Sequence, residues 1–270
     1  MRNLAKRVLI AAVGIPLLLA VARLGKWYVV ALVLALQLAI LPEWLRLWRS
    51  DGIRSLVPAM ILAALAVDFL LIAPDSKLAT IVAAAVLGIL LIAGLFFSKR
   101  RPLAVLSGVA LYVFYIALPL AFWIPLATVN RFVRLEPAGA LVILFVATWM
   151  CDSAAYFVGR YAGRRPLFTQ ASPNKTVEGF VGGFVGSSLI LPALAGLGWV
   201  SPLPLDYVML PIIVGLGGQA GDLLESLMKR ESSLKDTSAI LPGHGGLLDR
   251  FDSLLISAPL FLAYLAATAA

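Results

Sequence analysis

Long apolar runs recur along the whole chain and limit its fold more than any other feature. Runs of about 20 apolar residues match the roughly 30 Å hydrocarbon core of a bilayer. Of the 270 residues, 61% are apolar and only 13% are charged. The strict apolar/polar alternation of an outer-membrane barrel is missing from the sequence. The sequence therefore predicts an all-α, polytopic integral membrane protein.

We expect about nine transmembrane helices in a single membrane domain, 1–270. The predicted spans are 8–22, 27–41, 56–73, 78–97, 103–126, 138–158, 179–199, 207–228 and 254–269. The region 1–135 holds the first five spans, and 136–270 holds the other four with most of the unusual polar residues. Residues 20–22 resemble a signal-peptidase site, but we expect the first run to stay as a span.

The basic residues predict the orientation in the membrane. Nine spans place the loops after even-numbered spans on the same side as the N-terminus. Only five of the 22 Lys and Arg residues fall on the other side: Arg23, Lys26, Lys77, Arg131 and Arg134. The positive-inside rule then makes the N-terminus cytoplasmic. The net charge of +8 reflects this loop bias and anionic lipid, and we expect no nucleic-acid partner.

The stretch 226–252 mixes acidic, basic and hydroxyl side chains around the only histidine of the chain. Just before it, Asp222 and Glu225 share a predicted helix face with Lys229. Two carboxylates near the membrane favour a bound cation, and oxygen ligands suit Mg²⁺. The alternative is an internal ion pair between Glu225 and Lys229.

A glycine-rich turn at 242–246 precedes Asp249 and Asp252, which are three residues apart and could face one cation. Glycines let backbone N–H groups turn toward an anion, and the turn leads into a helix start. The alternative is a flexible loop followed by helix-start acids. With no second histidine for a zinc site, His244 is better explained as a hydrogen-bond donor.

A third polar cluster runs from Asp152 through Arg164 and Arg165 to Lys175. Asp152 is a carboxylate within a span and so a functional candidate. The cations could hold phosphate or simply reflect the positive-inside bias. Asp68 also lies in a span, where a helix–helix hydrogen bond is an equal explanation. Cys151, the only cysteine, is expected to be a small packing residue.

Carboxylates, cations and a glycine turn together indicate metal-assisted phosphoryl or nucleotidyl transfer. The segments 226–230, 235–236 and 242–252 resemble the signature of the phosphatidate cytidylyltransferases, also called CDP-diglyceride synthases. The segments 152–156 and 172–179 resemble the same family. The resemblance is strong from about residue 145 onward, which makes 136–270 the catalytic region.

The resemblance implies that CTP and phosphatidate react to give CDP-diacylglycerol and pyrophosphate, with Mg²⁺ as cofactor; a second cation is left open. It also implies a homodimer. The distribution of basic residues places the stretch 226–252, and so the expected site, on the cytoplasmic face of the cell inner membrane. The expected catalytic residues are Asp222, Asp249, Lys175 and Lys229. The expected metal ligands are Asp222, Asp249, Asp252 and Asp152. The expected substrate-binding residues are Ser172, Asn174, Lys175, Thr176, Arg230, Lys235, His244, Gly245, Gly246 and Arg250.

Two other functions remain open from the sequence. A CTP-dependent lipid-alcohol kinase would use similar residues to transfer the γ-phosphate. A transporter could use Asp68, Asp152 and Asp222 as coupling carboxylates, although it should show an internal repeat, and we find no convincing one.

Overall fold

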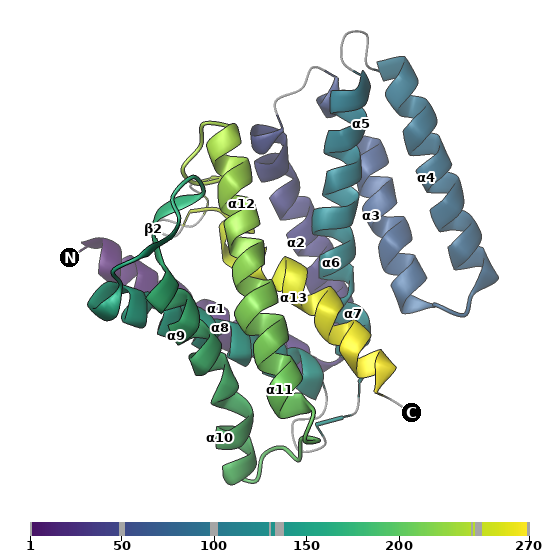
Figure 1. Cartoon of the computed structure of the whole chain (residues 1–270). Coiled ribbons are helices and arrows are strands. Elements are labelled where there is room, and N and C mark those ends of the chain that lie inside the picture. Colours follow the sequence, from purple (N-terminus) through teal and green to yellow (C-terminus); the bar gives the residue numbers. More distant parts are fainter. Residues whose placement is uncertain are drawn as a thin grey trace.

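Each apolar run of the sequence forms a helix, or a chain of short helices, in the computed structural model (Figure 1). The structure describes residues 2–48, 52–97, 102–129, 131–132, 138–238, 240 and 245–268. The first half consists of α1 (Arg2–Leu24), α2 (Lys26–Leu47), η1 (Ile53–Leu56), α3 (Val57–Ile72), α4 (Lys77–Phe97), α5 (Pro102–Leu111), η2 (Tyr112–Ala117), α6 (Leu118–Ala121) and α7 (Trp123–Leu126).

The second half is also helical, apart from one hairpin. It consists of α8 (Gly139–Ala162), β1 (Pro166–Phe168), β2 (Ser172–Thr176), α9 (Val177–Ser188), α10 (Ile190–Gly196), α11 (Asp206–Pro211), η4 (Ile212–Gly218), α12 (Gln219–Glu231) and α13 (Leu248–Ala267). The all-α prediction is confirmed. The strands form a small antiparallel hairpin in a connection for which the sequence predicted no secondary structure.

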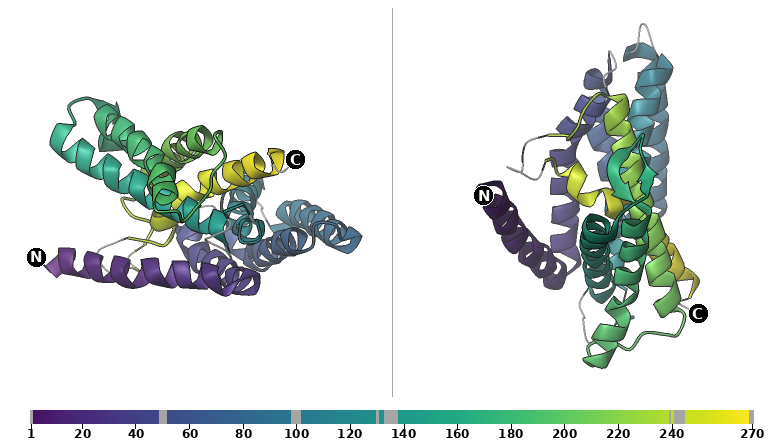
Figure 2. Two further views of the ribbon diagram at one scale, coloured as in Figure 1. Left: turned by 90° about the horizontal axis from the view of Figure 1, so that it is seen from below. Right: turned by 60° about the vertical axis from the view of Figure 1, so that its left-hand side comes forward.

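Seven of the described helical segments are long and apolar enough to cross a membrane. They are Lys26–Leu47, Ile53–Ile72, Pro102–Leu126, Gly139–Ala162, Val177–Gly196, Asp206–Glu231 and Leu248–Ala267. Two shorter apolar helices, Ile10–Leu24 and Lys77–Leu90, coincide with the two other predicted spans. The chain is therefore a polytopic membrane protein, while nine crossings and a cytoplasmic N-terminus stay predictions. Helix α1 lies at the edge of the molecule (Figure 2).

Two spans are interrupted by wider π-helical turns at η2 and η4. Segment η4 includes Gly215, Gly217 and Gly218, so the irregular backbone falls where the glycines predict it. A Cβ at Gly215 would lie 2.8 Å from the Phe184 ring, which shows how closely η4 approaches α9.

The glycines of α9 bring it against α8 along much of its length. A Cβ at Gly179 would lie 2.9 Å from the carbonyl oxygen of Ala155, and one at Gly183 would lie 3.0 Å from that of Cys151. The sequence of α9 contains two overlapping GxxxG patterns, Gly179/Gly183 and Gly182/Gly186, which permit such a close helix contact. The helix that they contact is α8 of the same chain.

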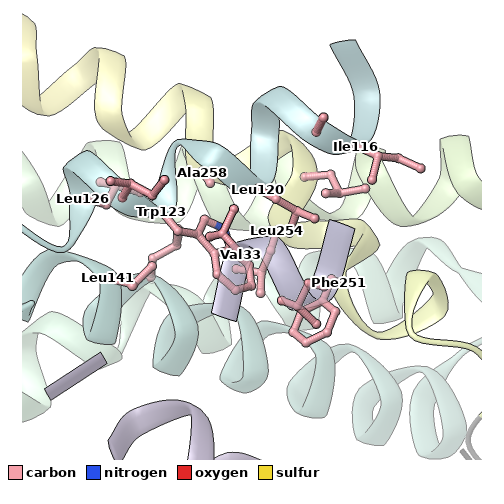
Figure 3. Close-up of a cluster of buried hydrophobic side chains, with 14 of the residues drawn as sticks. Val33, Ile116, Leu120, Trp123, Leu126, Leu141, Phe251, Leu254 and Ala258 are labelled. Carbon is pink, nitrogen blue, oxygen red and sulfur yellow. The ribbon is translucent and has the colours of Figure 1, made fainter. Parts of the chain in front are cut away.

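An aromatic cluster joins the two halves of the chain (Figure 3). The ring of Trp123 on α7 is fully buried and meets Phe145 on α8 edge-on at 4.9 Å and Phe251 on α13 at 5.5 Å. Val33 and Leu120 from the first half and Leu254 from the second belong to the same hydrophobic core. Helix α13 is thus held by apolar contacts to both halves.

Two local predictions about the first half have definite outcomes. Of the two explanations left open for Asp68, the helix–helix hydrogen bond is present: the Gln37 amide on α2 donates to its carboxylate at 2.9 Å. The end of the second span was wrong, because α2 continues through Pro42 to Leu47. A proline bends a helix without always ending it, and the extra turn carries Glu43 into the bundle.

Candidate active site

A cavity of about 610 Å³ opens where α8, β2, α9, α12 and the start of α13 meet. Its polar lining comprises Asp152, Tyr156, Arg160, Asn174, Lys175, Thr176, Gln219, Asp222, Lys229, Asp236, Asp249, Arg250, Asp252 and Ser253. Segments that are a hundred residues apart in the sequence therefore face one space. All four predicted catalytic residues and all four predicted metal ligands are among them.

Lys175 and Asp222 form an ion pair at this cavity. The ammonium nitrogen of Lys175 on β2 lies 2.5 Å from Oδ2 of Asp222 in the first turn of α12. About a third of each side chain is exposed, 29% and 33% respectively. Ion pairs this exposed contribute only about 0–1 kcal/mol. Both groups can therefore change partners when an anion or a cation enters.

Lys229 forms a more buried network. Its ammonium contacts Glu225 one turn earlier on α12 and Oδ1 of Asp249 on α13 at 2.6 Å. Glu225 is fully buried. The ion pair that we considered as the alternative for Glu225 is therefore present, and it extends to Asp249. Removing one member of a buried pair costs about 3–5 kcal/mol, so this network locks α12 against α13.

The second oxygen of Asp249 binds the segment that precedes α13. Oδ2 accepts hydrogen bonds from the backbone N–H of Gly246 at 2.7 Å and of Thr237 at 3.1 Å. Gly245 has φ of +80°, a left-handed conformation that favours glycine. Metal binding by Asp249 and phosphate binding by Gly246 stay predictions, and each requires an existing bond to open.

Asp152, Asp222 and Asp252 are three of the carboxylates that line the cavity. Asp222 lies close enough to the other two to interact with them electrostatically. Asp252 accepts a hydrogen bond from the N–H of its neighbour Ser253, at 2.7 Å. Like charges gathered in a partly enclosed space favour a bound cation.

The donor chemistry fits Mg²⁺, which takes one or two carboxylates together with substrate phosphates and waters. Among the residues that the structure describes, no three His, Cys, Asp or Glu side chains form a ready metal cage. Binding of Mg²⁺ at these carboxylates therefore stays a prediction.

The other predicted substrate-binding residues divide into two groups. Asn174, Thr176 and Arg250 line the cavity. Thr176 also begins α9, because its hydroxyl accepts a hydrogen bond from the N–H of Gly179 at 3.1 Å. Within the described chain, the predicted residues outside the lining are Ser172, Arg230, Lys235, Gly245 and Gly246. His244 lies outside the described residues.

Arg230 has structural partners at the edge of the site. Its Nε donates to the carbonyl oxygen of Ala171 at 3.2 Å, and Nη1 donates to that of Leu234. The first bond joins the hairpin turn to the end of α12, and the second holds the residues that directly follow α12. A role for Arg230 in substrate binding stays a prediction.

Sequence reasoning missed three residues of this region. Asp236 and Gln219 line the cavity, and Gln219 donates to the carbonyl oxygens of Phe180 at 3.0 Å and Gly215 at 2.5 Å. Glu43 lies beneath the segment before α13 and is fully buried. Its signal in the sequence was an acid directly after Pro42 in an apolar run.

The fold and the cavity define a polytopic membrane protein with a charged site at one end of its helices. Comparison with known proteins defines it further. A model of the cytidylyltransferase family matches residues 5–268. The chain belongs to this family, as the resemblance predicted.

Curated relatives align with part of the chain. A phosphatidate cytidylyltransferase of Bacillus subtilis (strain 168) is 48% identical over 139 residues, covering 50% of each protein. Proteins of the same name from Staphylococcus saprophyticus and Staphylococcus aureus (strain COL) are 44% identical over 128 and 129 residues, which cover 47% of this chain and 49% of each relative. The chain spans about half the length of the curated relatives it matches.

Proposed function

We propose that this protein transfers the cytidylyl group of CTP to phosphatidate and so forms CDP-diacylglycerol and pyrophosphate. The observation that carries the proposal is 48% identity to a relative named phosphatidate cytidylyltransferase, within a chain of the cytidylyltransferase family. The cavity supports it because cations and carboxylates face one space, as a reaction between two phosphate compounds requires.

In the proposed reaction a phosphate oxygen of the lipid attacks the α-phosphorus of CTP. A new P–O bond forms while the bond from the α-phosphorus to the bridging oxygen breaks, and pyrophosphate leaves with that electron pair. The phosphate monoester is already anionic near neutral pH, so no strong general base is needed. Lys175 and Arg250 would bind phosphate oxygens, while Lys229 would keep Asp249 in place.

Mg²⁺ would be held by one or two of the carboxylates of Asp222, Asp152 and Asp252 together with substrate phosphates, and Asp249 could take part only if its bonds to Gly246 and Thr237 open. When bound, the metal neutralises the triphosphate. The chain's part is to hold these carboxylates on three separate helices, α8, α12 and α13, around one space.

We also propose that the site faces the cytoplasm from the inner membrane. The bias of Lys and Arg residues toward one side supports this orientation, and CTP is available on that side. Phosphatidate would keep its acyl chains in the bilayer and present its headgroup at the cavity. A homodimer is proposed from the family resemblance alone.

The test uses purified protein, phosphatidate, Mg²⁺ and CTP labelled at either the α- or the γ-phosphate. We expect α-label in a lipid that migrates as CDP-diacylglycerol and γ-label in pyrophosphate. γ-Label in a lipid product with an added lipid alcohol would instead indicate a kinase. Absence of α-label from every lipid would refute the proposal.

A further inference from the structure

Glu43 is fully buried, and its carboxylate accepts four hydrogen bonds from described residues: three from the segment between α12 and α13 and one from Leu248, the first residue of α13. Oε1 accepts from the Ser238 hydroxyl at 2.6 Å and from the N–H of Leu247 at 2.9 Å. Oε2 accepts from the Thr237 hydroxyl at 2.8 Å and from the N–H of Leu248 at 2.9 Å. A carboxylate can accept about four hydrogen bonds, so these four donors occupy the acceptor positions of both oxygens.

These bonds fix the start of α13. The first N–H groups of a helix have no partner within the helix, and Leu247 and Leu248 stand at that position in α13. A negative charge there is also favoured by the helix dipole. Asp249, the next residue, lines the cavity, so Glu43 on α2 determines where the acidic end of α13 lies.

Glu43 and Asp249 both accept a hydrogen bond from Thr237. The Thr237 hydroxyl lies 2.8 Å from Glu43 and 3.1 Å from Asp249. A Cβ at Gly246 would collide with the Thr237 hydroxyl and the Glu43 carboxylate, so a glycine is needed between them. The geometry couples α2, in the first half of the chain, to the site in the second half.

We propose that Glu43 is a positioning residue for nucleotidyl transfer: it holds the N-terminus of α13 so that Asp249 and Asp252 face the cavity correctly. This inference rests on the proposed function, because its effect on kcat is measured in the cytidylyl-transfer assay. Glu43 is not among the described residues that line the cavity, so its effect on the reaction passes through α13.

Glu43→Gln tests the proposal directly. The amide keeps one acceptor oxygen, while its NH₂ group must face the N–H of Leu247 or of Leu248, neither of which can accept. We expect kcat to fall about tenfold to a hundredfold, since small misplacements have such effects. The Mg²⁺ concentration for half-maximal activity should rise, while KM for phosphatidate stays near the parent value.

Matched variants separate positioning from folding. Thr237→Val removes the hydroxyl between Glu43 and Asp249 at similar volume, and we expect a clear loss of kcat. Ser238→Ala removes one bond to Glu43 and none to Asp249, and Glu43 keeps its bonds to the N–H groups of Leu247 and Leu248. We therefore expect kcat to stay within about twofold of the parent. If Glu43→Gln does not fold, the comparison of Thr237→Val with Ser238→Ala still tests the proposal. An equal fall of kcat in these two variants would overturn it.

Amide hydrogen exchange supplies a readout that does not depend on activity. In folded Glu43→Gln, the N–H groups of Leu247 and Leu248 should exchange faster than in the parent, with exchange in α8 unchanged. Parent-like exchange together with parent-like kcat and Mg²⁺ dependence would overturn the proposal. A parent protein that forms no CDP-diacylglycerol would refute the proposed function instead, and the exchange data would still report on Glu43.

Discussion

Asp222 is the carboxylate of the cavity whose partner is most easily exchanged, because its ion pair with Lys175 is about one-third exposed. We predict that Asp222→Asn lowers turnover about a hundredfold or more, as expected when a group that holds or orients a metal is lost. The α-label assay measures the loss, and a thermal melt checks that the variant is folded. Near-normal turnover would remove Asp222 from the proposed metal shell.

Lys175 and Lys235 were both predicted to bind substrate, but only Lys175 is among the described residues that line the cavity. We predict that Lys175→Ala raises KM for CTP about tenfold, the usual scale for a lost bond to a charged group. Lys235→Ala is the matched control, an exposed lysine at the same end of the molecule. Equal losses in the two variants would bring Lys235 into the site.

At the residue scale, the sequence predicted several of the side chains that line the cavity but not which groups each of them contacts. Asp152, Asp222, Asp249 and Asp252 were recognised because charge is rare in an apolar chain. Their partners could not be read, because Lys175 and Asp222 meet only after β2 and α12 pack together. Glu43 was missed for the same reason: the groups that it binds are about 200 residues away.

At the element scale, glycine content determines how closely helices approach. A Cβ at Gly179 would meet the backbone oxygen of Ala155 at 2.9 Å and Gly159 Cα at 3.1 Å, and backbone cannot rotate away. Overpacking costs about 1–3 kcal/mol, which exceeds the roughly 0.5–1 kcal/mol that alanine gains over glycine within a helix. We predict that Gly179→Ala lowers the Tm and reduces activity.

Gly88 in α4 is the matched control, since a Cβ there would meet nothing within 4 Å. Gly88→Ala should leave the Tm unchanged or raise it slightly. A Tm for Gly179→Ala at or above that of the parent would show that α8 and α9 can separate without cost. A parallel fall in Gly88→Ala would show that the effect is not specific to the α8–α9 contact.

The apolar runs predicted where the helices lie along the chain, but they did not predict the residues at which the helices begin and end. Every predicted span coincides with a helical segment, because each run supplies enough apolar surface for one crossing. Pro42 was taken as a stop, yet α2 continues for a further turn. Helix α13 begins at Leu248, before the predicted apolar start at residue 254, because Glu43 binds its first N–H groups. Such ends depend on distant side chains.

At the scale of the whole molecule, the connection between α3 and α4 lies at the opposite end from the C-terminal end of α12 and the hairpin (Figure 1). Asp75 lies in the first of these connections and Lys235 just beyond α12, and both are exposed. If the helices between them span a membrane, the two positions face different compartments. The bias of basic residues assigns Lys235 to the cytoplasmic side.

The chain's single cysteine makes this arrangement testable. Cys151 is buried, and a Cys151→Ala background would carry either Asp75→Cys or Lys235→Cys. We predict that a membrane-impermeant maleimide labels Asp75→Cys in intact cells, and labels Lys235→Cys only in inside-out vesicles or after permeabilisation. The reverse pattern would contradict the proposed orientation. Labelling of both from one side would mean that an even number of crossings separates them. One of the helices between them, such as α4, would then lie outside the set of true spans.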